Sequence, residues 1–402
     1  MRVVASGSQE EQVETVEIQS YTKCGHTQGT PSGSDEGWIE MKRETRNGTT
    51  CWEANVVPDH PITKFRINGK TEDNLDGQGI TPLKAKINTI TLTVGTPHYT
   101  IDQTTGAYTV HTAKGLQAWA DHVNNGKWNT DCTLADDITL IGTNNWIPVS
   151  NVNDDNYYSG VFDGAGHSIT GINISTSASQ GNQGIGLFGY LSSSGTVKNL
   201  TLKDANITVT GYSRWSVYAG GIVGHSMGGT ISGCHFSGTI SCTSSAWNSC
   251  AGGITGQSDN ESKIIGCSSS GTITASAPTS SSYASYAGGI AGNISTATYT
   301  GSSLIGCWST ASTTATGGNA QNAGTFCGGA TDATFTACYF NGNQGIGNDG
   351  GGNTGSPTQI SNGDWSTAME AMNQALSSYG IQWVKNEGAD QNTVPLILNY
   401  GQ

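Results

Sequence analysis

The phrase AGGIVG at 219–224 recurs, with small changes, along the middle of the chain and decides the predicted fold. Its other copies are GIGLFG at 184–189, AGGITG at 251–256, AGGIAG at 287–292 and AGTFCG at 323–328. Their final glycines lie 35, 32, 36 and 36 residues apart, so the period is nearly constant. Repetition at such a period indicates a solenoid or a propeller, in which each repeat forms one structural unit.

A second phrase follows each glycine phrase after a short, variable gap. It reads VKNLTL at 197–202, ISGCHFSGTI at 231–240, IIGCSSSGTI at 264–273, LIGCWSTAST at 304–313 and FTACYFNG at 335–342. Most units thus offer three short β-prone runs, which are the glycine phrase, the segment around the cysteine and a β-branched tail. Three strands and a loop in about 35 residues make one coil of a parallel β-helix, whereas a propeller blade requires a fourth, antiparallel strand. We therefore predict an all-β protein built mainly as a right-handed parallel β-helix, because parallel crossovers are right-handed by default.

Stacked coils place equivalent residues above one another at a spacing of about 4.8 Å. Equivalent places are occupied by the cysteines Cys234, Cys267, Cys307 and Cys338. We interpret them as an inward structural ladder of small apolar side chains, with disulfide bridges as the alternative. Trp215, Trp247 and Tyr283 form a second column, each four residues before the alanine of its glycine phrase. If this column faces outward, it suits sugar rings or a protein partner, and the alternative is that the rings only shield the coil edge.

The flanking segments predict three further parts. Residues 1–97 show strand-like alternation, for example at 62–67 and 87–94, and predict a small antiparallel β-sandwich-like domain. Within it, Cys24 and Cys51 are either bridged or free. Residues 98–150 predict a lead-in hairpin and a capping helix that begins at Thr112. The predicted β-helix occupies 151–345 and has about six coils; a C-terminal cap at 346–402 contains an amphipathic helix at 364–376 and closing strands.

Composition limits the function classes. The 402 residues carry a net charge of −13, which argues against nucleic acid or an anionic membrane surface as a partner. No apolar run approaches the roughly 20 residues of a membrane span. The N-terminus lacks the apolar core of a signal peptide, so we expect either a processed or truncated chain or a cytosolic protein. The ten cysteines show no metal-ligand spacing.

Reactive groups are sparse in the repeats. No Asp, Glu, Lys or Arg lies between Lys263 and Asp332. We interpret Asp259 and Glu261 as part of a solvated loop, and His225 and His235 as surface histidines. Glycoside hydrolysis requires two carboxylates about 5–10 Å apart, and a lyase requires a base, so the repeats favour a scaffold without catalysis.

Two local patterns suggest chemistry. Asp154 and Asp155 lie among asparagines in the segment 151–158, and their oxygens would suit Ca²⁺, although the spacing is not that of an EF-hand. The pentapeptide GHSMG at 224–228 matches the nucleophile elbow of hydrolases. That motif requires a following helix and a later histidine, and no histidine follows His235, so we interpret the match as chance.

The repeats resemble the GLUG-motif repeats of large bacterial surface proteins, including some of the IgA-peptidase type, through Gly186-Leu-Phe-Gly189 and the AGGI-x-G phrases. The aromatic residue of the motif is missing from the latter. The lead-in, with its Phe162-Asp-Gly-Ala-Gly-His167, also resembles the approach to such repeats, so the resemblance covers roughly 99–398. The N-terminal region is similar to the fimbrillin-like domains of Bacteroidetes surface proteins through Gly37-Trp38 and 86–94, and we expect it to lack its beginning.

The resemblance implies a cell-surface protein, associated with the outer membrane, or a secreted one. We expect a non-catalytic adhesin that binds a glycan, or a protein of the host, the matrix or a neighbouring cell, through the solenoid turns. No cofactor is expected apart from the Ca²⁺ considered above. A β-helix polysaccharide lyase or glycoside hydrolase is the rival expectation, and a passive structural stalk is a third.

Overall fold

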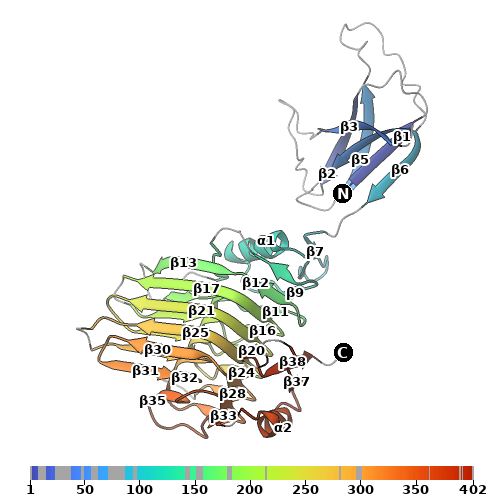
Figure 1. The fold of residues 1–402 in the computed structure, drawn as a ribbon. Helices are drawn as coiled ribbons and strands as arrows, with labels where there is room; N and C mark the ends of the chain where they lie inside the picture. Colours follow the sequence, from blue (N-terminus) through green and yellow to red (C-terminus); the bar gives the residue numbers. More distant parts are fainter. Residues whose placement is uncertain are drawn as a thin grey trace. The chain divides into compact units, whose positions relative to one another are not determined.

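The computed structural model describes residues 97–140, 145–150, 157–178, 183–212, 215–279, 282–295, 301–361, 363–388, 391 and 393–400, together with the backbone of six strands before Pro97. The chain divides into two compact units, Met1–Pro97 and His98–Gln402, which are described separately (Figure 1).

The first unit is antiparallel, as expected. Its strands follow the order β5-β2-β3-β4-β1-β6. Their bounds are β1 (Arg2–Gly7), β2 (Thr15–Thr22), β3 (Trp38–Arg46), β4 (Thr49–Asn55), β5 (Ile62–Lys70) and β6 (Ile87–Thr93). β3 pairs with β2 through its first half and with β4 through its second half, so it joins two groups of strands. The cysteine pair predicted here lies outside the residues whose side chains are described.

The second unit is a parallel β-helix with four sheets (Figure 1). Sheet 1 contains β14 (Gln183–Ile185), β18 (Val217–Gly220), β22 (Ser249–Gly252), β26 (Ala284–Gly288) and β31 (Ala320–Gly324). Sheet 2 contains β15 (Phe188–Leu191), β19 (Val223–Met227), β23 (Thr255–Asp259), β27 (Ala291–Ile294), β32 (Cys327–Ala330) and β35 (Ile346–Asp349).

Sheets 3 and 4 complete each coil. Sheet 3 contains β7 (Tyr99–Ile101), β8 (Tyr108–Val110), β9 (Cys132–Leu134), β11 (Val161–Asp163), β16 (Thr196–Lys198), β20 (Thr230–Ser232), β24 (Lys263–Ile265), β28 (Ser303–Ile305) and β33 (Thr334–Thr336). Sheet 4 contains β10 (Ile138–Thr139), β12 (Ser168–Thr170), β17 (Thr201–Gly211), β21 (His235–Ser244), β25 (Ser268–Ser276), β29 (Trp308–Ser309), β34 (Tyr339–Phe340) and β36 (Thr358–Gln359), with β13 (Asn173–Ala178) beside β17 and β30 (Ser312–Thr316) beside β25. Apart from the hairpin of β7 and β8, these strands pair in parallel, and the register between β17 and β21 shifts after Leu202.

A full coil therefore has four strands, where the sequence predicted three. Glycines break two of the predicted runs, and the segment after the cysteine joins the β-branched tail in a single strand, as in β21. The glycine phrase supplies the last strand residues of sheet 1 and the first of sheet 2, and its isoleucine is fully buried between them, as at Ile254. A Cβ atom on the last glycine of a phrase would overlap the backbone of the preceding coil, as Gly256 would at the Ala219 nitrogen. Gly256 lies in β23, where the lack of a side chain lets the backbones of sheets 1 and 2 approach each other.

The second break precedes the cysteine. Gly233, Gly266 and Gly306 have φ of 59°, 57° and 61°, and they turn the chain from sheet 3 to sheet 4. Asn199 occupies the same place with φ 54° and Ala337 with φ 48°. Left-handed backbone is accessible to glycine without steric cost and is tolerated by asparagine.

The predicted helix α1 (Ala113–Asn124) lies over the first coil. The Thr112 hydroxyl accepts a hydrogen bond from the Gly115 N–H and caps the helix start. Its apolar stripe is buried, and the Trp119 ring packs against Phe162 and Tyr158 of the coils below. The solenoid begins earlier than the predicted residue 151, since β9 already pairs with β11 and β10 with β12.

The solenoid also ends later than residue 345. The glycine-rich run after Cys338 is a further rung, in which β35 pairs with β32 and β36 pairs with β34. The Gly345 carbonyl accepts hydrogen bonds from the Phe326 and Cys327 amides. This rung has few apolar side chains, so the sequence shows no hydrophobic period there. Its backbone nevertheless covers the apolar rings of the preceding coil.

The C-terminal module, 363–400, consists of α2 (Ser366–Ala375) and a hairpin of β37 (Ile381–Lys385) and β38 (Leu396–Tyr400). Helix and strands are where the sequence predicted them, but they lie against the side of the last coils. They form a second apolar core with outward-facing residues of the solenoid, including Ile265, Ile305 and Trp308. The end of α2 packs against the turn between sheets 3 and 4 at Gly306, because the Leu376 side chain fills the space beside this glycine. Neither helix in the described part of the chain is long and apolar enough to cross a membrane.

Candidate binding surfaces

The predicted aromatic column lies on the turn that joins sheet 4 to sheet 1. The Trp247 and Tyr283 rings stack with their centroids 4.6 Å apart and an interplanar angle of 24°. Both rings are half-buried, and each covers one face of the other. Trp215, on the preceding coil, is 51% exposed.

The same turn carries a further exposed aromatic that sequence reasoning missed. Tyr212 follows β17 and is 66% exposed, the largest value among the exposed large apolar residues in the described part of the chain. It lacks counterparts in the other coils, so alignment of the repeats gave no signal for it. We call Tyr212, Trp215, Trp247 and Tyr283 the aromatic edge. Large rings gathered on one side of a solenoid offer flat apolar surface for contact with a ligand.

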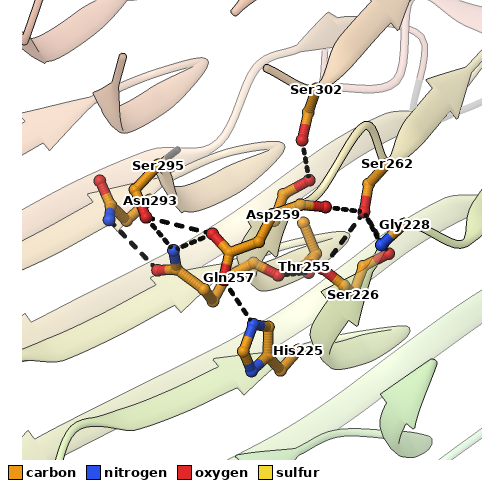
Figure 2. A network of polar contacts seen from close by, with 11 residues as sticks. His225, Ser226, Gly228, Thr255, Gln257, Asp259, Ser262, Asn293, Ser295 and Ser302 are labelled. Carbon is orange, nitrogen blue, oxygen red and sulfur yellow. Dashed lines mark hydrogen bonds and ion pairs between the residues drawn. The ribbon is translucent and has the colours of Figure 1, made fainter. Parts of the chain in front are cut away.

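A polar network occupies the outer face of sheet 2 (Figure 2). His225, Gln257 and Asn293 stand one above another on β19, β23 and β27. The His225 Nε2 atom lies 2.8 Å from Asp259 Oδ2, and Gln257 Nε2 donates to Asp259 Oδ1 at 2.7 Å (Figure 2). The Ser295 hydroxyl donates to the same carboxylate oxygen at 3.1 Å.

Two sequence interpretations are wrong here. His225 is not a surface histidine, because it is 7% exposed and packs against the Tyr218 ring at 4.9 Å. Asp259 is not in a solvated loop, because it ends β23 and receives three hydrogen bonds. The two residues are 34 positions apart, close to one repeat, so stacking of the coils brings them together. Sequence alone gave no signal for the pair, since neither residue repeats.

The nucleophile-elbow match has the wrong geometry, in agreement with its interpretation as chance. Ser226 is fully buried, and its hydroxyl shares a hydrogen bond of 2.9 Å with the Ser262 hydroxyl (Figure 2). Strand β19 continues to Met227 and is followed by β20, whereas the elbow requires a helix. Ser226 and its neighbour His225 also alternate across the strand, so the imidazole cannot activate this hydroxyl.

The predicted cysteine ladder lies in the core. Cys234, Cys267, Cys307 and Cys338 are buried and free, and each thiol donates to the carbonyl two residues before it. The Cys267 amide also donates to Cys307 Sγ at 3.4 Å, which links two coils. Burial raises the pKa of the Cys267, Cys307 and Cys338 thiols well above its usual range. These thiols are therefore apolar filling groups and not nucleophiles.

The Ca²⁺ prediction at Asp154 and Asp155 lies outside the described residues. Among the residues that are described, no group of three or more His, Cys, Asp or Glu side chains is arranged to hold a metal ion.

A groove of about 490 Å³ separates the outer face of sheet 4 from the C-terminal hairpin. Strands β17, β21 and β25 form one wall, and β37, β38 and the turn between them form the other. Sequence reasoning missed this groove, because its walls come from segments more than a hundred residues apart.

Comparison with known proteins identifies the repeats. The family model described as "The GLUG motif" matches residues 216–241 and 248–274, which are two successive coils. A stretch of 80 residues is 34% identical to halomucin from Haloquadratum walsbyi and covers 20% of this chain and 1% of halomucin. The chain therefore carries GLUG-motif repeats, and in this fold each repeat supplies strands to all four sheets.

Two solved structures match most of this chain. One is provisionally assigned as an immunoglobulin A1 protease from Bacteroides ovatus, with 16% identity, a TM-score of 0.49 and coverage of 75% of this chain and 94% of that chain. The other is named IgA1 Protease, with 15% identity, a TM-score of 0.42 and coverage of 85% of this chain and 24% of that chain.

Proposed function

We propose that this chain is a non-catalytic, cell-surface or secreted adhesin that binds a glycan or a host or matrix protein through its solenoid turns. In this proposal the N-terminal unit is a fimbrillin-like domain of Bacteroidetes type. The GLUG repeats and the local similarity to halomucin support a surface role. The aromatic edge is the contact surface.

The observation that carries the proposal is the exposure of Tyr212 and Trp215 on one turn, beside the stacked pair of Trp247 and Tyr283. Apolar rings exposed singly are ordinary, but rings gathered on one edge mark a place of contact. Aromatic faces suit the C–H faces of sugar rings and the apolar anchors of protein interfaces.

A glycan and matrix-protein array with the full chain tests the proposal. We expect binding that falls about tenfold or more in Tyr212→Ala and Trp215→Ala. Tyr379→Ala is the matched control, because Tyr379 is also exposed, at 44%, but lies beyond α2 on the C-terminal module. A lyase assay on acidic polysaccharides runs beside the array. Release of unsaturated uronate products would support a lyase function over the adhesin function. An array on which nothing binds would favour a passive stalk.

A further inference from the structure

We propose that the groove between sheet 4 and the C-terminal hairpin binds a neutral oligosaccharide end, one or two sugar rings long. This site is separate from the aromatic edge, and the proposal does not depend on the edge.

One wall of the groove carries hydrogen-bonding side chains, of which Thr201, His235 and Ser237 are partly exposed, whereas Ser268 is fully buried and Ser270 is 5% exposed. Thr201, His235 and Ser268 stand in register on three successive coils, and Ser237 and Ser270 form the next row. His235 Nδ1 lies 2.7 Å from the Ser268 hydroxyl, which fixes the orientation of the imidazole. Hydroxyl and imidazole groups can both donate and accept hydrogen bonds, as sugar hydroxyls require.

The column of sheet 4 that contains Thr201, His235 and Ser268 becomes apolar further along the solenoid. The positions that follow Ser268 in register are Trp308 and Tyr339, which pack in the second apolar core beneath the C-terminal module. The module covers the apolar half of the column and leaves the polar half as the floor of the groove. The change from apolar to polar residues therefore coincides with the edge of the module.

The opposite wall is mainly apolar. Its accessible apolar surface comes from Leu398, which is half-buried, and from Ile397, which is 43% exposed, whereas Trp383 and Leu396 are each only 1% exposed. The polar residues Asn386 and Thr393 also line this wall. A groove with a hydroxyl-rich wall and an aliphatic wall matches a sugar ring, which has polar edges and an apolar face. Its volume is within the range of small-molecule sites, about 300–1,000 Å³.

Charge favours a neutral ligand. Among the described residues that line the groove, Lys203 and Asp204 carry a full charge, and their charges cancel. The pKa of Asp137, a carboxylate outside the groove lining, is lowered mainly by the hydrogen bond from the Ser168 backbone N–H and to a smaller extent by Lys203. An acidic sugar would meet little net positive charge here, on a chain whose total charge is −13.

Calorimetric titration of the full chain tests the site, with lactose, maltose and N,N′-diacetylchitobiose as neutral probes and digalacturonate as the acidic probe. We expect at least one neutral disaccharide to bind, and Ser237→Trp and Ile397→Trp to weaken it about tenfold or more by filling the groove. Ile147→Trp is the matched control, because Ile147 is 51% exposed and does not line the groove. Trp215→Ala should leave this binding unchanged, which separates the groove from the aromatic edge.

Three results would overturn the proposal. They are the absence of heat from every neutral probe at about 10 mM, binding unaffected by both groove-filling variants, and stronger binding of digalacturonate than of any neutral probe. The melting temperature of each variant, measured in parallel, shows that a loss of binding is not a loss of folding. If the array identifies an adhesin ligand while all disaccharides fail, the groove proposal falls and the adhesin proposal stands.

Discussion

Gly252 and Thr255 approach each other so closely across the corner between sheets 1 and 2 that a Cβ atom on Gly252 would overlap the Thr255 carbonyl oxygen. The same overlap would occur between Gly220 and Val223 and between Gly288 and Ala291. The conserved spacing of the glycine phrase within this chain thus has a steric cause. Backbone atoms cannot move aside as a flexible side chain can.

We expect Gly252→Ala to lower the free energy of unfolding by about 3 kcal/mol, because neither the added methyl group nor the two backbones have room to shift. Gly363→Ala is the control, since Gly363 has φ +72° but open space around it, and it should cost only about 1 kcal/mol. Urea denaturation followed by circular dichroism measures both. Equal urea midpoints for the two variants would show that the corner can accommodate an added methyl group.

Ala337 occupies the left-handed position that glycine fills in three other coils, with φ 48°. We expect Ala337→Gly to stabilise the protein by about 1 kcal/mol, because it removes the steric strain of a Cβ atom in that region. The reverse change at the equivalent position, Gly306→Ala, should destabilise it, since the new Cβ would lie 2.6 Å from Leu376 Cγ. A thermal melt measures both shifts. A lower melting temperature for Ala337→Gly would mean that the alanine methyl contributes more packing than strain.

The buried cysteines should not react in the folded protein. Burial raises the pKa of the Cys242 thiol to about 12 and holds Cys267 and Cys307 well above their usual range. The reactive thiolate is therefore scarce at pH 8, and the reagent has no access. We expect iodoacetamide to label the peptides of these cysteines only after denaturation, as read by mass spectrometry. Rapid labelling of the native protein, or a mass loss that reveals a disulfide, would contradict the free and buried ladder.

Trp383 should anchor the C-terminal module to the solenoid. Its indole N–H donates to the Gly306 carbonyl at 2.7 Å, and its ring packs edge-on to Trp308 at 5.7 Å. We expect Trp383→Ala to cost about 3–5 kcal/mol and to release the module, because it removes both contacts from a buried site. Limited proteolysis should then cleave between α2 and β38 while the coils stay intact, and Tyr379→Ala should leave the pattern unchanged. Resistance equal to that of the unaltered chain would show that the other contacts of the module suffice.

Much of the fold could be predicted from the repeats. The cysteine phrases predicted which residues stack, and Thr112 and the amphipathic pattern at 364–376 predicted the two helices. The number of strands in a coil could not be predicted from the sequence. A turn at a glycine divides a β-prone run into two strands, but the run has the composition of a single strand. The rung after residue 345 was not predicted because it is held mainly by hydrogen bonds between backbones and has few apolar side chains.

Of the candidate sites, the sequence located Trp215, Trp247 and Tyr283 by their period. It could not locate the pair of His225 and Asp259 or the groove, whose residues do not repeat.

The sequence by itself determined the coil, because each repeat contains the glycines and the apolar residues that one coil requires. Only the tertiary structure decided what lies beside the coil, including the docking of the C-terminal module on Trp308 and the groove that this docking leaves open. Stacking joins residues one period apart, whereas lateral docking joins segments with no fixed separation. No local pattern can specify such a contact.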